Sequence, residues 1–247
     1  MKLIVANWKM NPESAQKATE LFEAVKNGVI DTKNVEVVIC PPFVYLPLFS
    51  GLTLGAQNVF FKEKGAFTGE VSPVMLKDLK VQYVIIGHSE ARKHLNETDE
   101  IINKKVKECL LVGLTPILCI GETIEEKESG RKEEVLKKQI TEGLAGVSNV
   151  NGQMSNVIIA YEPVWAIGTG HSCSSEETQE MVSAIREIIT DLYEKELSDT
   201  MRILYGGSVD SKNSNSYLAI SGLSGLLIGS DSLDAQDFIK IVASAGI

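Results

Sequence analysis

Glu162 has the clearest potential for chemistry in this sequence. It follows the apolar run VIIA at 157–160, which predicts a buried strand that carries one carboxylate to the end of a sheet. The next segment, PVWAIGTG at 163–170, combines a stiff proline, an apolar tip and two glycines, as in a hinged lid. A carboxylate beneath a lid that excludes water suits proton abstraction from carbon, because a desolvated base is stronger and the intermediate is shielded.

Other polar residues follow other predicted strands. Asn7 and Lys9 lie two positions apart, so on an extended chain they are expected to share a face, where Lys9 can stabilise developing negative charge. His88 precedes Ser89 and Glu90, which are expected to begin a helical turn whose amides keep the imidazole neutral. A neutral imidazole can polarise a carbonyl and move protons between adjacent oxygens. The ordinary alternatives are a solvated lysine and a histidine satisfied by local backbone.

Two glycine turns in successive units predict an anion site. The motif GGS at 206–208 follows one predicted strand, and GS at 229–230 follows the next. Glycines let backbone amides approach a ligand, and Ser208 adds a hydroxyl. Barrels of alternating strands and helices build phosphate sites from these two loops. Each turn alone is more often only a turn, but the two together favour phosphate binding.

Short apolar runs that favour strands alternate with amphipathic stretches along the whole chain. The predicted strands are residues 3–6, 35–40, 53–56, 83–86, 115–120, 157–161, 202–205 and 225–228. The predicted helices are residues 14–27, 97–111, 131–144, 174–197 and 235–245, with shorter ones at 42–49, 73–79 and 212–220.

This alternation predicts a parallel sheet that is buried on both faces. Eight such units in 247 residues favour an α/β fold of the (β/α)8 TIM-barrel type, with residues 1–247 as one domain. An open, doubly wound sheet is the alternative. It should have a glycine-rich turn after its first strand, but the sequence there is NWKMN at 7–11.

Composition limits the classes of partner. The formal net charge of -9 argues against nucleic acid or an anionic membrane, and it requires local groups to hold any anionic substrate. The 4 cysteines are scattered without metal-binding spacing, so we expect reduced thiols, a cytoplasmic protein and no metal. The first residues lack the apolar stretch of a signal peptide, and no apolar run has the length of a membrane span.

The sequence resembles the triosephosphate isomerase family along nearly its whole length. The matching segments are ANWKMN at 6–11, GAFTGE at 65–70, GHSE at 87–90, CIGE at 119–122, the segment from Glu162 to Gly170, and YGGSV at 205–209. The resemblance implies a glycolytic and gluconeogenic enzyme that interconverts dihydroxyacetone phosphate and D-glyceraldehyde 3-phosphate through an enediolate. It also implies that no metal or organic cofactor takes part.

The resemblance also assigns roles to residues. It implies that Glu162 is the base that moves a proton between two substrate carbons, and that His88 is the neutral electrophile at the enediolate oxygens. Asn7 and Lys9 would bind substrate and stabilise the charged intermediate, with Glu90 as a supporting carboxylate.

The resemblance further implies a phosphate site and a partner subunit. Backbone amides of Gly168, Ser208, Gly229 and Ser230 would bind the phosphate. The loop from Gly65 to Glu70 would join two copies in a homodimer, with Thr68 reaching toward the neighbouring active site.

Three positions depart from the family pattern. Ala91 replaces a common arginine, His171 stands near the end of the lid, and Asp231 follows Ser230 in the second glycine turn. Asp231 brings a negative charge close to the expected phosphate, so we predict a modestly raised KM. Two other functions stay open: a binding protein that kept the barrel without catalysis, and another phosphosugar enzyme, such as an aldolase or epimerase, on the same fold.

Overall fold

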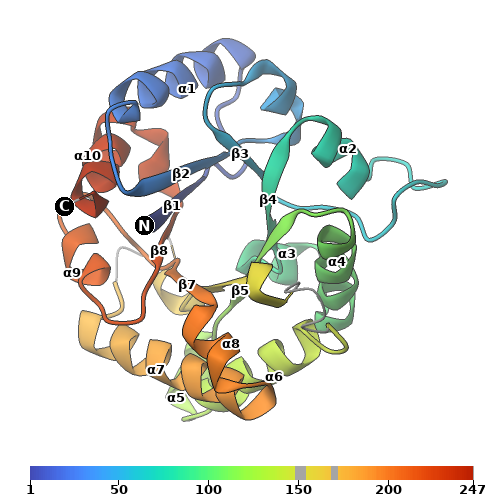
Figure 1. Cartoon of the computed structure of the whole chain (residues 1–247), viewed down its shortest axis with the longest axis vertical. Helices are drawn as coiled ribbons and strands as arrows, with labels where there is room; N and C mark the ends of the chain where they lie inside the picture. The colour runs from blue at the N-terminus through green and yellow to red at the C-terminus, as the bar shows by residue number, and fades with distance from the viewer. Residues whose placement is uncertain (148–153, 168–171, 247) are drawn as a thin grey trace.

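Parallel strands close into a barrel in the computed structural model, which describes residues 1–147, 154–167 and 172–246 (Figure 1). Each strand pairs with the next along the chain, and the last pairs with the first. The strands are β1 Lys2–Asn7, β2 Val35–Cys40, β3 Thr53–Ala56, β4 Val81–Ile86, β5 Thr115–Ile120, β6 Ile158–Tyr161, β7 Arg202–Tyr205 and β8 Gly225–Ile228. The predicted (β/α)8 fold is confirmed, and every predicted strand is present.

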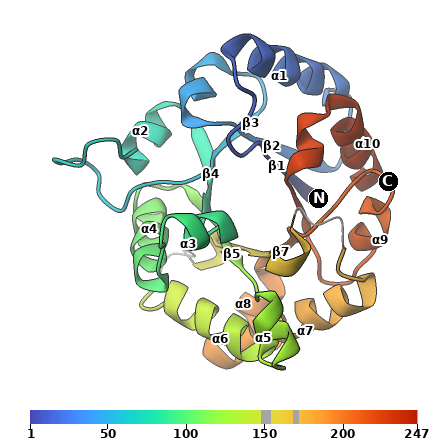
Figure 2. The ribbon, with the colours of Figure 1, turned by 180° about the vertical axis from the view of Figure 1, so that it is seen from behind.

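Helices surround the barrel on its outside (Figures 1 and 2). The α-helices are α1 Ala15–Val29, α2 Pro73–Asp78, α3 Ser89–His94, α4 Asp99–Leu111, α5 Ile124–Glu128, α6 Lys132–Gly143, α7 Ser175–Leu192, α8 Lys195–Thr200, α9 Ser214–Leu218 and α10 Ala235–Ala245. Short 3-10 helices are η1 Phe43–Leu48, η3 Met154–Asn156, η4 Val164–Ala166 and η5 Ser230–Leu233. Side chains of Ser14, Thr98 and Ser174 cap α1, α4 and α7, which explains where these helices begin.

The predicted helix at 174–197 is wrong in one respect, because the structure divides it into α7 and α8. The helix ends at Tyr193, whose backbone (φ -131°, ψ -108°) leaves the helical region. Beyond it α8 packs back on α7: the Arg186 guanidinium donates to the Met201 carbonyl at 2.7 Å, and the Ser198 hydroxyl donates to the Arg186 carbonyl at 2.8 Å. Neither glycine nor proline marks the break, so local sequence patterns could not reveal it.

The core has two layers, one inside the barrel and one between the strands and the helices. On β1, Leu3 and Val5 belong to the inner cluster, whereas Ile4 and Ala6 belong to the outer one. Ile158 and Ala160 of β6 belong to the inner cluster too. Since side chains alternate along a strand, the next inward positions are Asn7, the last residue of β1, and Glu162, the residue that follows β6.

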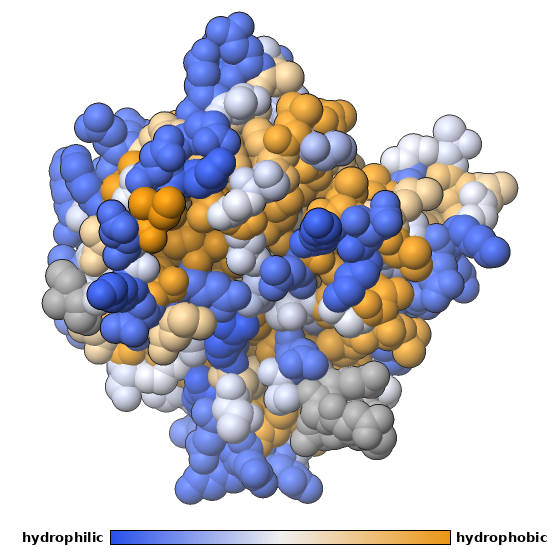
Figure 3. All heavy atoms as spheres, turned by 45° about the horizontal axis from the view of Figure 1, so that its top comes forward, coloured by the Kyte–Doolittle hydropathy of each residue, from blue (hydrophilic) through white to orange (hydrophobic). Residues whose placement is uncertain are grey.

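The segment between β3 and α2 projects from the barrel as an arm (Figures 1 and 2). Phe67 in this segment is 42% exposed, and its ring packs against Phe60 with 4.6 Å between ring centroids. In the space-filling view, hydrophobic patches interrupt the hydrophilic surface (Figure 3). In the described part of the chain, no helix is both long and apolar enough to cross a membrane.

Candidate active site

A pocket of about 120 Å³ lies where the carboxyl ends of the strands meet. It brings together predicted site residues that are distant in the sequence. They are Asn7, Lys9, His88, Glu162, Ser208, Gly229 and Ser230. Gly168, the remaining residue predicted to bind phosphate, lies outside the described residues, as does His171.

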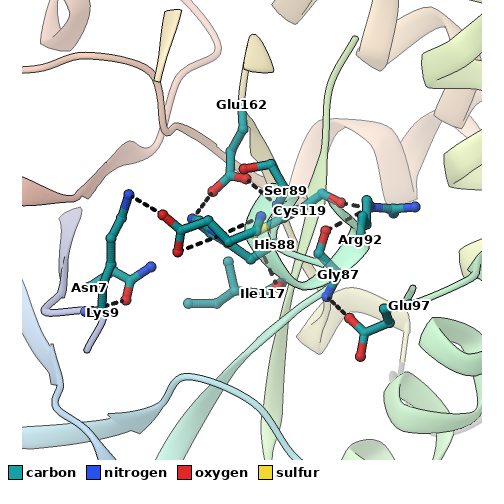
Figure 4. A network of polar contacts seen from close by, with 11 residues as sticks. Asn7, Lys9, Gly87, His88, Ser89, Arg92, Glu97, Ile117, Cys119 and Glu162 are labelled. Atoms are coloured by element: carbon teal, nitrogen blue, oxygen red, sulfur yellow. Dashed lines mark hydrogen bonds and ion pairs between the residues drawn. The ribbon is translucent and has the colours of Figure 1, made fainter. Parts of the chain in front are cut away.

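Glu162 lies at the bottom of this pocket with 2% of its surface exposed. Its Oε1 is 3.4 Å from Nε2 of His88, and its Oε2 accepts a hydrogen bond from the Ser89 amide at 3.4 Å. Figure 4 shows the Glu162 carboxylate directed toward His88. Both contacts are long, so the carboxylate is oriented without being tightly bound.

His88 is the N-cap residue of α3, as the expected helical turn requires. Its Nδ1 accepts a hydrogen bond from the Glu90 amide at 3.2 Å. An accepting Nδ1 carries a lone pair, so this hydrogen-bond arrangement assigns the ring proton to Nε2 of a neutral imidazole. The donor nitrogen therefore faces the pocket and Glu162.

Asn7 and Lys9 meet at the pocket, but the expected reason is wrong. Strand β1 ends at Asn7, and Lys9 has a left-handed backbone with φ of 54°, so the two residues do not share the face of one extended strand. Instead the Asn7 Oδ1 accepts from the Lys9 amide at 3.1 Å, and Gln57 donates to the Lys9 carbonyl at 2.8 Å. Contacts with the last residue of β1 and with Gln57, just after β3, thus set the direction of Lys9.

The ammonium group of Lys9 forms an ion pair with Glu90, at 2.7 Å between Nζ and Oε1. Partial burial acts to raise the pKa of Glu90, but the hydrogen bond from Lys9 and the positive charge of Lys9 act in the opposite direction, and the pKa is lowered. Glu90 therefore stays ionised and holds the lysine through this ion pair.

The two glycine turns form another part of the pocket wall, and Gly229 lies beside Lys9, since a Cβ atom there would be 3.4 Å from the Lys9 Cε. The Asn213 side chain donates to the Ser208 carbonyl at 3.3 Å, and the Ser232 hydroxyl donates to the Gly229 carbonyl at 2.6 Å. These bonds fix both turns from outside the pocket. Ser208, Gly229 and Ser230 all line the cavity, as their positions after β7 and β8 predicted.

Comparison with known proteins agrees with this geometry. The family model described as triosephosphate isomerase matches residues 2–245. A curated relative, the triosephosphate isomerase of Dictyoglomus thermophilum, is 47% identical over 249 residues, which cover 98% of this chain and 99% of the relative.

The chain belongs to the triosephosphate isomerase family. It is an aldose–ketose isomerase that interconverts dihydroxyacetone phosphate and D-glyceraldehyde 3-phosphate, a reaction of glycolysis and gluconeogenesis. The resemblance seen in the sequence is therefore confirmed, and the two alternative functions are set aside.

Supporting residues of this isomerase were not predicted from its sequence. Arg92 donates from Nε to the Gly87 carbonyl at 2.8 Å and from Nη2 to the Cys119 carbonyl at 3.2 Å, and it pairs with Asp99 at 2.6 Å. The Gly87 amide donates to Glu97 at 3.1 Å. The residue before His88 is thus held at both its N–H and its C=O by charged side chains that look like ordinary helix-surface residues in the sequence.

A second support holds the end of β5 beside Glu162. The amide group of Gln139 on α6 accepts from the Gly121 N–H at 2.8 Å and donates to the Gly121 carbonyl at 3.2 Å. On β7's side, a Cβ atom at Gly206 would lie 2.9 Å from Cγ of Glu162. In the sequence, Gly121 and Gly206 are recognisable as glycines that directly follow strands. That both of them lie against Glu162 depends on the closed barrel.

Glu122 anchors the segment that follows Glu162. This fully buried carboxylate accepts from the Trp165 indole at 2.7 Å and from the Tyr161 hydroxyl at 3.2 Å. Burial raises the pKa of Glu122, although these donors oppose the shift. The start of the expected lid is therefore tied to the end of β5, and the residues from 168 to 171 lie outside the described part of the chain.

Proposed function

We propose that Glu162 is the catalytic base of this isomerase. The observation that carries the proposal is the placement of a carboxylate with 2% exposure 3.4 Å from a neutral imidazole at the bottom of the pocket. A desolvated carboxylate can remove a proton from the carbon beside a carbonyl and return it to the neighbouring carbon. One group can do both because the two carbons are adjacent.

His88 is proposed as the electrophile. Its Nε2–H points into the pocket, because Nδ1 is occupied by the Glu90 amide. A neutral donor can polarise the substrate carbonyl and then pass its proton between the two enediolate oxygens. The same imidazole therefore serves both directions of the isomerisation.

Asn7 and Lys9 are proposed to bind substrate and stabilise the negative charge that develops on its oxygens. The ammonium group of Lys9 is fixed by Glu90 at 2.7 Å, so it needs little reorganisation during reaction. Glu90 is proposed to support this arrangement, since its ionised form holds the lysine while its backbone amide orients His88.

The phosphate is proposed to bind at backbone amides of Ser208, Gly229, Ser230 and Gly168. The first three line the wall of the pocket that lies after β7 and β8, where barrels of this type bind phosphate. No cofactor is proposed, because Glu162 can move a proton between the two carbons and His88 can move one between the two oxygens.

Residues 1–247 are proposed to form one domain that works as a cytoplasmic homodimer. The arm from Gly65 to Glu70 supports the dimer, since it extends away from the barrel and carries the partly exposed Phe67. In the dimer, Thr68 would reach toward the partner's active site. Sedimentation equilibrium tests the homodimer, and a monomer at micromolar concentration would contradict it. Cell fractionation tests the cytoplasmic location.

The first experiment measures isomerisation of glyceraldehyde 3-phosphate by coupling it to reduction of dihydroxyacetone phosphate. Glu162→Gln keeps the shape of the side chain but removes the base, so we expect kcat to fall by at least about 10³-fold with the fold intact. The same assay is applied to His88→Gln and Lys9→Met, which remove the proposed electrophile and the proposed stabilising charge. A Glu162→Gln variant that kept more than a tenth of wild-type turnover would exclude Glu162 as the base.

A further inference from the structure

A carboxylate lines the wall of the pocket at which the phosphate is proposed to bind. Asp231 is the second residue of η5 and lies in the pocket lining beside Gly229 and Ser230. Its side chain is partly buried, and its Oδ2 accepts a hydrogen bond from the Ser230 hydroxyl at 3.2 Å. The turn that offers amide donors to an anion thus also carries a group of the same charge as the ligand.

Two further carboxylates act on Asp231 from neighbouring elements. Asp210 follows β7 and accepts hydrogen bonds from the amides of Lys212 and Asn213 at 2.8 and 2.9 Å. Asp237 on α10 accepts from the Ser211 amide at 3.1 Å. Both carboxylates act to raise the pKa of Asp231, so they add negative potential on this side of the pocket.

One positive charge lies near this wall, and a carboxylate other than Asp231 already neutralises it. Lys9 is the one lysine or arginine among the pocket-lining residues that the structure describes. Its Nζ would lie 3.8 Å from a Cβ atom at Gly229, and it is paired with Glu90 at 2.7 Å. An anion at the glycine turns therefore meets backbone dipoles, serines and a lysine that Glu90 already pairs with, while it faces the charge of the Asp231 carboxylate.

We infer that Asp231 sets the affinity of this isomerase for phosphorylated ligands by repelling their phosphate group. The inference rests on the proposed phosphate site at Ser208, Gly229 and Ser230. The phosphate takes no part in bond breaking, so the repulsion is similar in the substrate, the intermediate and the product. A uniform effect of this kind raises KM and leaves kcat nearly unchanged.

The variant that tests the inference is Asp231→Asn. Asparagine keeps the size of the side chain and the acceptor for the Ser230 hydroxyl, but it removes the charge. Charges roughly 8 Å apart in a partly hydrated pocket change an equilibrium constant by about three- to tenfold. We therefore expect KM for glyceraldehyde 3-phosphate and the inhibition constant of sulfate to fall by that factor, with kcat within about twofold of wild type.

Asp234→Asn is the matched control. Asp234 is exposed, lies in the same loop outside the pocket lining, and caps α10 by accepting from the amides of Gln236 and Asp237 at 2.9 and 3.0 Å. Asparagine also caps helices, so this variant loses the same net charge without touching the pocket. Equal changes in the two variants, or no change in Asp231→Asn, would overturn the inference.

Varying the pH provides a second readout. Burial, followed by Asp237 and Asp210, raises the pKa of Asp231 although the Ser230 hydroxyl opposes the shift. Sulfate stays dianionic over the range studied, so its binding to the wild type should approach that of Asp231→Asn as the pH falls and Asp231 gains a proton. A wild-type to variant ratio that stays constant down to the pKa of an ordinary aspartate would contradict the assignment of the effect to Asp231.

Failure of the phosphate site itself would look different. Sulfate bound at the two turns must shift the backbone amide resonances of Ser208, Gly229 and Ser230 in a 15N spectrum, in the wild type and in Asp231→Asn alike. If these resonances do not move, the proposed phosphate site is wrong. If they move but sulfate affinity is equal in the two proteins, the site stands and the role of Asp231 is rejected.

Discussion

The α-carbon of Gly121 lies directly against the backbone carbonyl of Glu162: a Cβ atom at position 121 would be 1.7 Å from that oxygen. The two strand ends are joined there, since the Glu162 amide donates to the Ile120 carbonyl at 2.8 Å. The backbone of Glu162, the proposed base, can take this position only because Gly121, directly after β5, has no side chain.

Gly121→Ala is expected to impair catalysis severely. The clash is with backbone atoms, which cannot move aside as a flexible side chain can, so the Glu162 main chain or the end of β5 must shift. We expect kcat to fall by at least about tenfold, because displacements of about 1 Å in a catalytic group have large effects on rate. Gly130→Ala is the control: no atom lies within 4 Å of its Cβ position, and its positive φ of 72° makes it costly for stability but not for turnover. Equal loss of kcat in the two variants would refute the prediction.

Gln139 is expected to act as a positioning residue through Gly121. Gln139→Leu removes both hydrogen bonds to the Gly121 backbone and leaves its N–H and C=O without these partners. We expect kcat to fall several-fold with little change in KM, since the phosphate wall is untouched. Steady-state kinetics of Gln139→Leu, Gln139→Glu and the exposed neighbour Lys138→Leu check this. Gln139→Glu keeps the acceptor for the Gly121 amide and should recover part of the loss, whereas a change confined to KM would contradict the role.

The tautomer of His88 can be tested directly. The bond from the Glu90 amide to Nδ1 requires the ring proton on Nε2. We expect the 15N spectrum of labelled histidine at about pH 8 to show a protonated Nε2 and an unprotonated Nδ1 for this residue. His88→Gln identifies the resonance and should lower kcat by about 10²–10⁴-fold. A proton on Nδ1 would contradict the proposed electrophile.

Lys105 and Glu97 form a buried ion pair, with side-chain exposures of 6% and 5%. Lys105→Met removes one charge and leaves the other buried, so we expect the apparent free energy of unfolding to fall by about 3–5 kcal/mol. Lys104→Met, on the same helix, breaks an exposed pair with Glu100 and should cost less than about 0.5 kcal/mol. Urea unfolding at one protein concentration compares the two variants. Similar losses in the free energy of unfolding of the two variants would contradict the prediction that the buried pair contributes more to stability than the exposed pair.

The cysteine thiols are expected to be unreactive in the folded protein. All four are buried, and burial raises the pKa of Cys109 and of Cys173 to about 12 and shifts Cys40 and Cys119 upward as well. The reactive thiolate is therefore both rare and inaccessible. Titration with Ellman's reagent at pH 8 should detect almost no thiol in the native state and all 4 after unfolding in guanidinium. Rapid reaction of a native thiol would show that its surroundings open readily.

The sequence predicted much of the site because chemistry in this fold follows the strand ends. Apolar runs located β1 and β6, and Asn7 and Glu162 are the next inward positions after them. Similarly, the glycine turns after β7 and β8 were recognisable from their composition. His88 was placed at the start of a helix, and α3 begins at the following residue.

By itself, then, the sequence determined the succession of strands and helices, the barrel, the family and most residues that line the pocket, because these depend on local periodicity and short motifs. Tertiary structure decided the break between α7 and α8, which Arg186 and Ser198 stabilise by long-range hydrogen bonds, and the left-handed turn that directs Lys9. It also decided that Gly121 leaves room for the Glu162 backbone. Such features arise when distant segments compete for the same space and the same hydrogen-bond partners, and a linear pattern of residues does not specify which segments will meet.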